Sequence, residues 1–271
     1  MAAKQGFGSV LSAEMKRVVF QPRRLITATI FAAAAILLFV GATALVDWGN
    51  NAAASGEIEG VEPIAIPAFI GFDMSLSLIS FCFGIYASAF VARDYNDGTV
   101  MASLLAVPNR GRLFLARLFP WVLLTAVFSL LAFAVVGALG INRAGTGEAT
   151  IIVLQGLLAT VSSVFTGIVG FCCGAITKKG SLSVLLFLAL FFLIPTVASA
   201  AGGFGPELLQ TIMDGINYAM PGNAFAALIG IVPLDGATTD TWISLGVSIA
   251  WVVAAPILSC ALFKTRATLG R

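Results

Sequence analysis

The chain has no histidine among its 271 residues, and only 10% of its residues are charged. It therefore has no Ser-His or Cys-His nucleophile, no histidine metal site and no histidine proton relay. It also lacks the G-x-x-x-x-G-K-[ST] loop that cradles nucleotide phosphates. We expect no catalytic residue, no cofactor and no metal ion in this chain. All four cysteines lie in apolar stretches without metal-ligand spacing, and we interpret them as small apolar residues: Cys82, Cys172, Cys173 and Cys260.

Hydrophobic residues make up 59% of the chain, and its mean hydropathy is +1.01. Soluble domains are about 25% charged, so a chain this apolar buries its surface in lipid. Crossing a bilayer takes about 20 apolar residues. Six runs have that length: 25–46, 69–91, 119–139, 150–176, 182–201 and 242–263. Because these runs are uniformly apolar rather than alternating, we predict an all-α integral membrane protein with six transmembrane helices in a single domain, 1–271.

The basic residues between these runs predict the orientation of the chain. Fourteen of the 15 fall in the N-terminal segment, the second and fourth connections and the C-terminus, and Arg143 is the exception. The positive-inside rule then places both termini in the cytoplasm. The first run is too long for the core of a cleavable signal peptide, so we expect it to remain as an anchor.

Two further helical elements are predicted outside the spans. Residues 9–20 combine apolar side chains with Glu14, Lys16 and Arg17, which favours an amphipathic helix on the inner membrane surface. The alternative is a disordered basic tail. The outer connection, 202–241, holds an apolar stretch broken by Pro221 and Gly222, so we predict one or two short helices dipping into the outer leaflet.

The span centres contain small residues but no ionisable ones. Gly170 and Gly174 form a G-x-x-x-G pair, which lets helices approach closely in lipid. Asp73 is the nearest ionisable residue to a span centre, and it lies near the outer boundary. Ion-coupled transporters usually place carboxylates or basic groups at mid-membrane depth, so this pattern disfavours that class.

The connection between the second and third runs, 92–118, is the most informative segment. Asp97 or Thr99 can cap a short helix, and Val100, Leu104 and Leu105 give that helix an apolar stripe. A short helix on a charged loop fits a docking element for a cytoplasmic partner; an interfacial helix without a partner is the alternative. The candidate docking residues are Asp94, Asp97, Gly98, Thr99, Leu104, Leu105, Pro108 and Arg110.

This segment resembles the permease subunits of type 2 ABC transporters, mostly bacterial exporters. Their pattern is an acidic residue after span 2, Gly-Thr, a short apolar helix, proline and basic residues; here it reads Asp94, Gly98-Thr99, Leu104-Leu105, Pro108, Arg110, Arg112 and Arg117. The family usually has Glu in place of Asp94 and Lys in place of Arg117, and both exchanges keep the charge. Residues Glu14, Lys16 and Arg17 resemble the family's elbow helix. Pro221 and Asn223 resemble its re-entrant region before span 6.

The resemblance implies an export permease in the cytoplasmic (inner) membrane. Two permeases, alike or different, would pair above two separate ATPase subunits that carry ATP and magnesium. The helix from about 98 to 107 would be the coupling helix, seated in the ATPase. Membrane lipid is the expected surrounding, and nucleic acid is not an expected partner.

The apolar spans suggest a lipophilic or amphipathic substrate such as a drug, an antibiotic peptide or a lipid. Two other classes stay open at this point. One is an ion-coupled secondary transporter or channel. The other is a membrane enzyme that uses Asp94 and Asp97, or an outer acid, as its reactive pair; the outer acids are Glu57, Glu59 and Glu62.

Overall fold

The computed structural model describes residues 6–19, 21–55, 67–107, 109–144, 149–204, 206–229 and 239–266. Within these ranges the secondary structure is helical. The helices are α1 (Phe7–Val19), α2 (Pro22–Ala54), α3 (Pro67–Asn96), α4 (Thr99–Ala106), α5 (Arg110–Ala144), α6 (Ala149–Thr177), α7 (Gly180–Leu188), the π-helical η2 (Ala189–Leu193), α8 (Ile194–Phe204), α9 (Glu207–Ala219), α10 (Pro221–Ile229) and α11 (Thr239–Arg266). Pro108 and the outer acids Glu57, Glu59 and Glu62 lie outside the described residues.

Among the described residues, five helical segments are long and apolar enough to cross a membrane. They are Leu25–Ala52, Arg110–Asn142, Ala149–Thr177, Gly180–Gly203 and Trp242–Phe263, and each contains one predicted run. The remaining predicted run, 69–91, lies within the 30-residue α3. The all-helical class is therefore confirmed, together with five membrane-length segments, and the sixth span stays a prediction.

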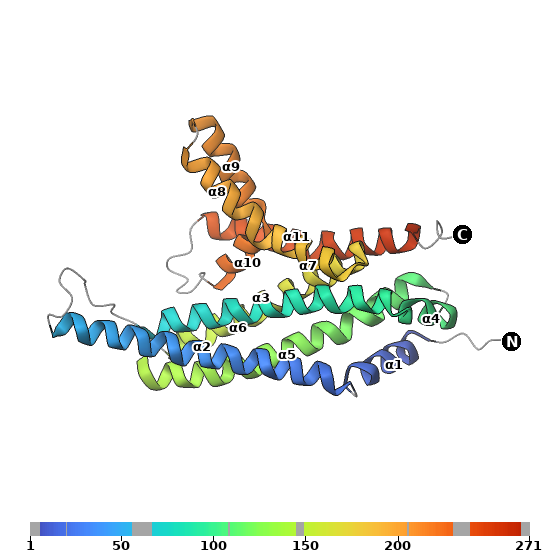
Figure 1. Ribbon diagram of the computed structural model, residues 1–271, viewed down its shortest axis with the longest axis horizontal. Coiled ribbons are helices and arrows are strands. Elements are labelled where there is room, and N and C mark those ends of the chain that lie inside the picture. The colour runs from blue at the N-terminus through green and yellow to red at the C-terminus, as the bar shows by residue number, and fades with distance from the viewer. Residues whose placement is uncertain are drawn as a thin grey trace.

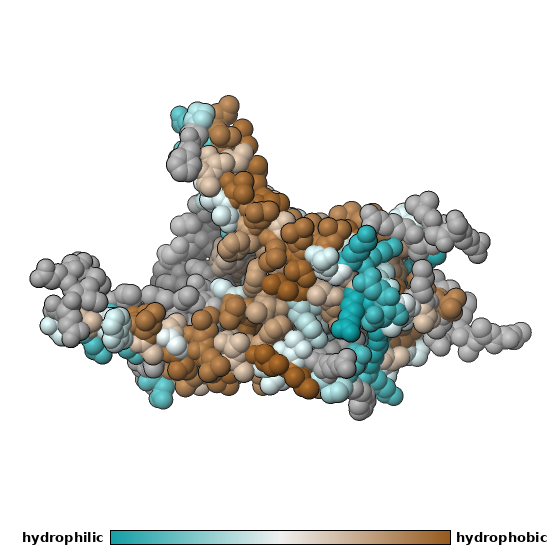
Figure 2. Space-filling model, in the orientation of Figure 1, coloured by the Kyte–Doolittle hydropathy of each residue, from teal (hydrophilic) through white to brown (hydrophobic). Residues whose placement is uncertain are grey.

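The surface of the helical body is largely apolar. Leu37, Leu131 and Ile257 are examples of large apolar side chains that point outward from α2, α5 and α11. Figure 2 shows a mostly hydrophobic surface crossed by a hydrophilic band toward the end where α1 and α4 lie. Water-soluble monomers rarely expose apolar surface on this scale, so the body of this protein faces lipid.

The long helices lie side by side, with the two ends of the body carrying different elements. Helices α2, α3, α5 and α6 run along the long axis, and α7 and α11 pack along one side (Figure 1). The elements α1 and α4 and the C-terminal end of α11 share one end of the body, while α8 and α9 project away from it. Helices α3 and α6 form the centre, where most of the buried apolar side chains meet.

Helix α6 approaches α3 through glycines, as the sequence predicts. A Cβ atom at Gly170 would collide with the backbone carbonyl of Gly84, and one at Gly174 would collide with the carbonyl of Ser88. Gly84 itself faces the ring of Phe187 on α7. We call Gly84, Ser88, Gly170 and Gly174 the glycine interface. It brings two backbones into contact, which maximises dispersion attraction where no hydrophobic force between helices exists.

Hydroxyl groups supply the polar contacts of the interior. The Oγ atoms of Ser80 on α3 and Ser163 on α6 share a hydrogen bond of 2.7 Å, and Ser162 Oγ donates to the Phe225 carbonyl at 3.0 Å. In the described part of the chain, every buried polar side chain is a serine or threonine. No charged group of the kind that ion-coupled transporters use lies buried there.

The fifth predicted run, 182–201, is not one regular α-helix. It divides into α7, η2 and α8, and in η2 the Ile194 N–H donates to the carbonyl of Ala189, five residues back. Pro195 explains the division, since it has no N–H to donate to the Phe191 carbonyl. Gly222 of α10 packs directly against the Phe191 backbone at this irregular turn.

The predicted short helices of the outer connection are present as α9 and α10, with the break at Met220. Pro221 begins α10 and is buried. Asn223 Nδ2 donates to the Asn217 carbonyl at 3.2 Å, and Asn217 Nδ2 donates to Ser199 Oγ at 2.9 Å, which ties the two helices to α8. Whether these helices enter the outer leaflet stays a prediction.

A helix also forms near the N-terminus, so the alternative of a disordered tail is wrong for residues 7–19. Val10 and Val18 of α1 are buried, while Lys16 points outward. Helix α1 packs against the start of α5. Pro22 begins α2, where its missing N–H breaks no helical hydrogen bond.

Candidate functional site

The residue before helix α4 is a glycine in a conformation that other residues rarely adopt. Gly98 has φ 70° and ψ 0°, in the left-handed region, and no side chain caps the helix. The prediction that Asp97 or Thr99 is the cap is therefore wrong. Thr99 Oγ1 instead donates backward to the Asp94 carbonyl at 3.0 Å, which fixes the tight turn between α3 and α4.

The apolar residues of α4 do not form one stripe. Val100 is 3% exposed and Leu104 packs against the core, whereas Leu105 is 90% exposed. Successive helical residues are rotated by about 100°, so Leu105 points away from the face that Leu104 buries. The helix is thus anchored by two apolar side chains and offers a third to the surroundings.

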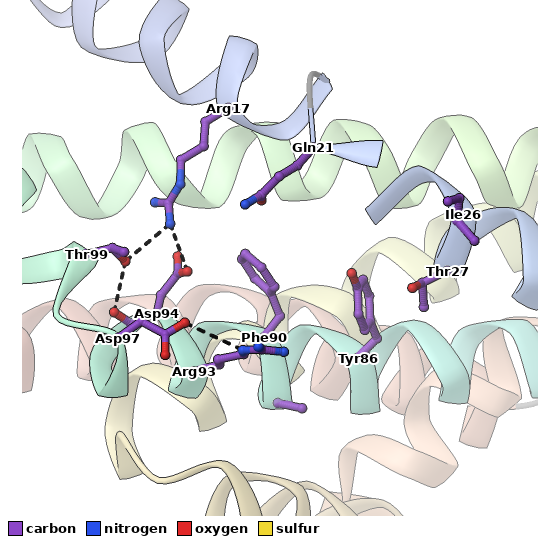
Figure 3. Close-up of a pocket in the computed structure, with 11 residues that line it drawn as sticks. Arg17, Gln21, Ile26, Thr27, Tyr86, Phe90, Arg93, Asp94, Asp97 and Thr99 are labelled. Atoms are coloured by element: carbon purple, nitrogen blue, oxygen red, sulfur yellow. Dashed lines mark hydrogen bonds and ion pairs between the residues drawn. The ribbon is translucent and has the colours of Figure 1, made fainter. Parts of the chain in front are cut away.

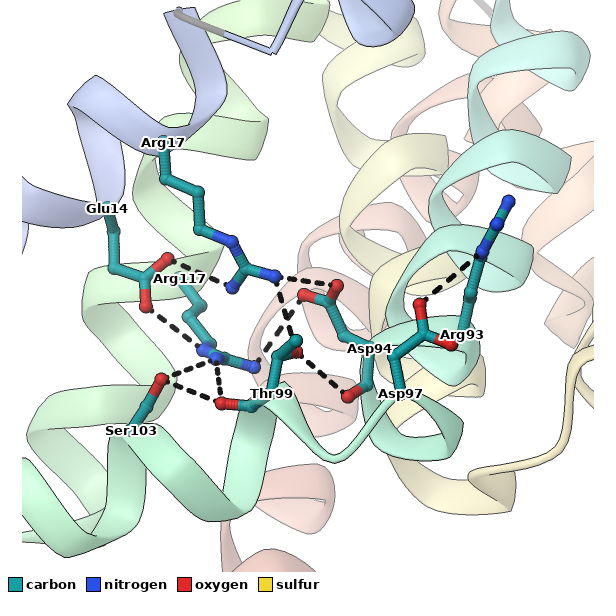
Figure 4. Close-up of polar contacts among 8 residues, drawn as sticks. All are labelled: Glu14, Arg17, Arg93, Asp94, Asp97, Thr99, Ser103 and Arg117. Carbon is teal, nitrogen blue, oxygen red and sulfur yellow. Dashed lines mark hydrogen bonds and ion pairs between the residues drawn. The ribbon is translucent and has the colours of Figure 1, made fainter.

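Four charged side chains gather between α1, α3 and α5, directly against α4 (Figure 4). Arg17 Nη2 donates to Asp94 Oδ1 at 2.9 Å, and Arg117 Nε donates to Glu14 Oε1 at 3.2 Å. Arg117 Nη1 also lies 3.7 Å from Asp94 Oδ2, and Arg17 Nη1 lies 3.6 Å from Glu14 Oε2. Each arginine therefore pairs with both carboxylates.

The same two arginines bond to α4. Arg117 Nη2 donates to Ser103 Oγ at 2.9 Å and to the Thr99 carbonyl at 3.3 Å, and Arg17 Nη2 donates to Thr99 Oγ1 at 3.2 Å. We call this set the ionic cluster; its members are Glu14, Arg17, Asp94, Thr99, Ser103 and Arg117. It joins α1 to the consecutive helices α3, α4 and α5, and it fixes where α4 lies.

The cluster is balanced in charge and largely sheltered from water. Its four charged side chains are 11–26% exposed. Removing one member of such a partly exposed group leaves its partner charged and unpaired, which costs about 2 kcal/mol. The cluster can hold and align α4.

Comparison with known proteins identifies the protein family of the chain. The family model of the ABC-2 family transporter proteins matches residues 9–267. The chain belongs to this family. It is a multi-pass membrane permease, the transport component of a system that normally works with an ATPase subunit. A search of curated proteins gives no match to the chain.

The permease places the other predicted residues in three groups. Asp97 is exposed and lies 3.5 Å from Arg93, one helical turn away. Lys16 is exposed on α1, and Arg110 begins α5 at the edge of the cluster region. Pro221 and Asn223 lie in α10, which packs on η2, α6 and α11 rather than on α4. The structure therefore brings Glu14 and Arg17 of the predicted elbow together with residues of the predicted docking segment, Asp94 and Thr99. It leaves Lys16, Asp97, Pro221 and Asn223 outside the cluster.

Two residues at this site were not predicted from the sequence, Ser103 and Tyr95. Ser103 completes the cluster, and its position four residues after Thr99 is the signal that could have found it. Tyr95 lies beside the cluster, where burial raises the pKa of its phenol above the ordinary range and keeps it neutral. Its ring packs edge-on against Phe263 of α11 at 6.3 Å and extends the link from α3 to the last helix.

Proposed function

We propose that this permease is the membrane subunit of an ATP-driven exporter, with α4 as its coupling helix. Two observations support this proposal together. The chain belongs to the ABC-2 family, and the ionic cluster holds α4 with the side chain of Leu105 90% exposed. A surface leucine on a rigidly held helix suits insertion into a hydrophobic cleft of a partner. ATP and magnesium then bind to two ATPase subunits, and the permease pairs with a second copy or a homologue.

In this proposal six segments cross the cytoplasmic membrane: α2, α3, α5, α6, the α7–η2–α8 segment and α11. Both termini and α4 face the cytoplasm, in line with the positive-inside distribution of basic residues. Helix α1 acts as the elbow, and α9 and α10 form the re-entrant region on the outer side. The shared end of α1, α4 and the C-terminal part of α11 supports an even number of crossings (Figure 1).

The ionic cluster gives the coupling a physical route. When the ATPases close on ATP, they displace α4, and Arg117 transmits that displacement to α5 while Arg17 transmits it to α1. ATP thus acts as the ligand that favours one of two arrangements of the helices. Asp94 positions the two arginines rather than touching the ATPase, because its side chain is only 13% exposed.

A lipophilic or amphipathic substrate fits an interior in which the buried polar residues that the structure describes are serines and threonines. Charged substrates would need buried counter-charges along their path, and hydroxyls supply only neutral hydrogen bonds. The class includes drugs, antibiotic peptides and lipids. An ion-coupled mechanism has less support, for the same reason.

The test is affinity purification of the tagged permease from its native membrane, followed by mass spectrometry. The proposal predicts recovery of a protein with a P-loop, and loss of that protein with Leu105→Arg. Recovery must persist in the control Lys179→Gln, which changes an exposed residue between α6 and α7. If no P-loop protein copurifies with the wild-type chain under cross-linking, the proposal is wrong.

A further inference from the structure

A cavity of about 570 Å³ lies beside the ionic cluster, between α1, the start of α2 and the last turns of α3. Its lining is Arg17, Gln21, Ile26, Thr27, Tyr86, Ala89, Phe90, Arg93, Asp94, Asp97 and Thr99. This volume lies within the range of about 300–1,000 Å³ that small-molecule sites occupy. Neither the coupling role of α4 nor the family membership assigns an occupant to it.

The lining changes from charged to apolar along α3 (Figure 3). Asp97, Asp94 and Arg93 lie at one end, and Phe90 and then Tyr86 follow toward the other, where Ile26 faces them from α2. Asp97 and Tyr86 are eleven residues apart, which is about 16 Å along a helix. A site with one charged and one apolar end fits an amphiphile.

The charged end contains two guanidinium groups and two carboxylates, so it favours neither an anion nor a cation. Arg17 and Asp94 are committed to each other at 2.9 Å within the cluster. Arg93 and Asp97 form a looser pair at 3.5 Å, with side chains 71% and 55% exposed. Exposed pairs of this spacing stabilise a helix by only about 0.3–0.5 kcal/mol, so a ligand can separate them at little cost.

We propose that this cavity binds a zwitterionic phospholipid of the inner leaflet. Arg93 donates to the phosphate, Asp97 accepts from the headgroup ammonium, and the upper part of an acyl chain lies along Phe90, Tyr86 and Ile26. The cavity is smaller than a complete two-chain lipid. The tails leave past Ile26, which is 57% exposed on the outer surface of α2.

The position of the cavity agrees with a lipid. Its apolar wall includes the first turn of the segment Leu25–Ala52, which is long enough to cross a membrane. Its charged wall is formed by Arg93, Asp94 and Asp97, at and just after the end of α3. Basic pockets between membrane helices on the cytoplasmic side bind anionic headgroups; here the carboxylate of Asp97 beside Arg93 matches a headgroup that carries both charges. The inference rests on the proposed orientation, which places this end in the cytoplasm.

The experiment is native mass spectrometry of the purified permease with phosphatidylethanolamine or phosphatidylglycerol added at equal concentration. We expect phosphatidylethanolamine to be retained at least about fivefold better, a difference of about 1 kcal/mol. Asp97→Asn should remove that preference, because only phosphatidylethanolamine carries the ammonium group. Arg93→Gln should lower the retention of both lipids, because both carry the phosphate. Arg112→Gln, an exposed arginine outside the cavity lining, should leave the preference and the retention unchanged.

A second variant blocks the cavity without altering its charge. Ala89→Trp fills the space between α2 and α3 and should abolish retention, whereas Ala33→Trp on the exposed surface of α2 should not. Equal retention of the two lipids by wild-type protein would overturn the proposal, as would full retention by Ala89→Trp. Equal binding of soluble glycerophosphoethanolamine would overturn the lipid assignment in favour of a headgroup site alone.

The isolated permease suffices for this test, so the outcome is separate from that of the ATPase proposal. Recovery of a P-loop partner without lipid preference would refute only the lipid site. Lipid preference without a P-loop partner would refute only the coupling role.

Discussion

The ionic cluster and the glycine interface hold helices together by opposite means. The cluster joins α1, α3, α4 and α5 through charged side chains that reach across the space between backbones. The glycine interface joins α3 and α6 by removing side chains, so that Gly170 meets the Gly84 backbone directly. A charged side chain costs more free energy at the centre of a bilayer than at its boundary, which explains why charges join the helices at one end of the body and glycines join them at its centre.

The two devices also differ in how easily they rearrange. Backbone contact across α3 and α6 has one geometry, and any added atom disturbs it. The arginines of the cluster each have several acceptors within reach, so the cluster can exchange partners while α4 shifts. We infer a rigid central pair of helices and an adjustable end, which is the arrangement that a driven permease needs.

The largest effect on stability should come from adding one methyl group at the glycine interface. Gly170→Ala should destabilise the permease by about 3 kcal/mol, because the new Cβ collides with the Gly84 carbonyl and neither backbone can yield. Thermal unfolding in detergent measures this. Gly41→Ala is the control, since nothing lies within 4 Å of a Cβ there and the exchange favours helix. Equal melting temperatures for the two variants would refute the interface.

Breaking the cluster should have the next largest effect. Arg117→Gln leaves Glu14 and Asp94 with one arginine between them and should cost about 2 kcal/mol. The transport rate should fall by more than the loss of folded protein explains, because α4 loses the hydrogen bond between Ser103 and Arg117 of α5. Stimulated ATPase activity and transport in proteoliposomes test this. Lys179→Gln, at an exposed position between α6 and α7, is expected to behave as wild type. Normal transport by Arg117→Gln would remove the cluster from the mechanism.

A smaller loss is expected from a neutral interior hydrogen bond. Ser80→Ala removes the 2.7 Å contact with Ser163. Single interhelical hydrogen bonds in membranes contribute about 0.6 kcal/mol on average, so a shift in melting temperature near the detection limit is expected. A loss as large as that of Gly170→Ala would mean that hydroxyls, rather than close packing, hold α3 to α6.

The smallest effect on stability should come from Leu105→Ala, within about 0.5 kcal/mol, because the side chain is 90% exposed. Its effect on ATPase association should nonetheless be large. Leu104→Ala is the informative comparison, since Leu104 packs inward. Copurification with the ATPase and melting temperature, measured on both variants, separate docking from folding. Unchanged association in Leu105→Ala would refute Leu105 as the contact.

Sequence patterns predicted most of the helices and the glycine face of α6, because both depend on residues close together in the chain. The partner of that face, Gly84 and Ser88 of α3, was not predicted. The convergence of the cluster could not be predicted in the same way. Arg17 and Asp94 are 77 residues apart, and Glu14 and Arg117 are 103 apart, so only the tertiary fold brings them together. Sequence analysis selected these residues separately, as elbow and loop residues, without pairing them.

The errors have local physical causes. Glycine satisfies the turn before α4 through its left-handed conformation, so no side-chain cap forms at Asp97 or Thr99. The apolar stripe failed at Leu105 because hydrophobicity alone does not show which residues of a short helix face a core. The irregular η2 follows from Pro195, which cannot donate a helical hydrogen bond. Gly222 of α10 packs against the backbone of this turn, a contact that the sequence of the turn alone does not predict.

The most direct measurement of the coupling proposal is the side of the membrane on which Leu105 lies. Leu105→Cys, in a chain whose four natural cysteines are replaced by alanine, would be treated with a membrane-impermeant maleimide. Ser55→Cys, just after the C-terminal end of α2, serves as the reference for the opposite side of the membrane. We predict labelling at 105 only in inside-out vesicles, with protection when the ATPase is bound. Labelling at 105 in intact cells would contradict the coupling role of α4.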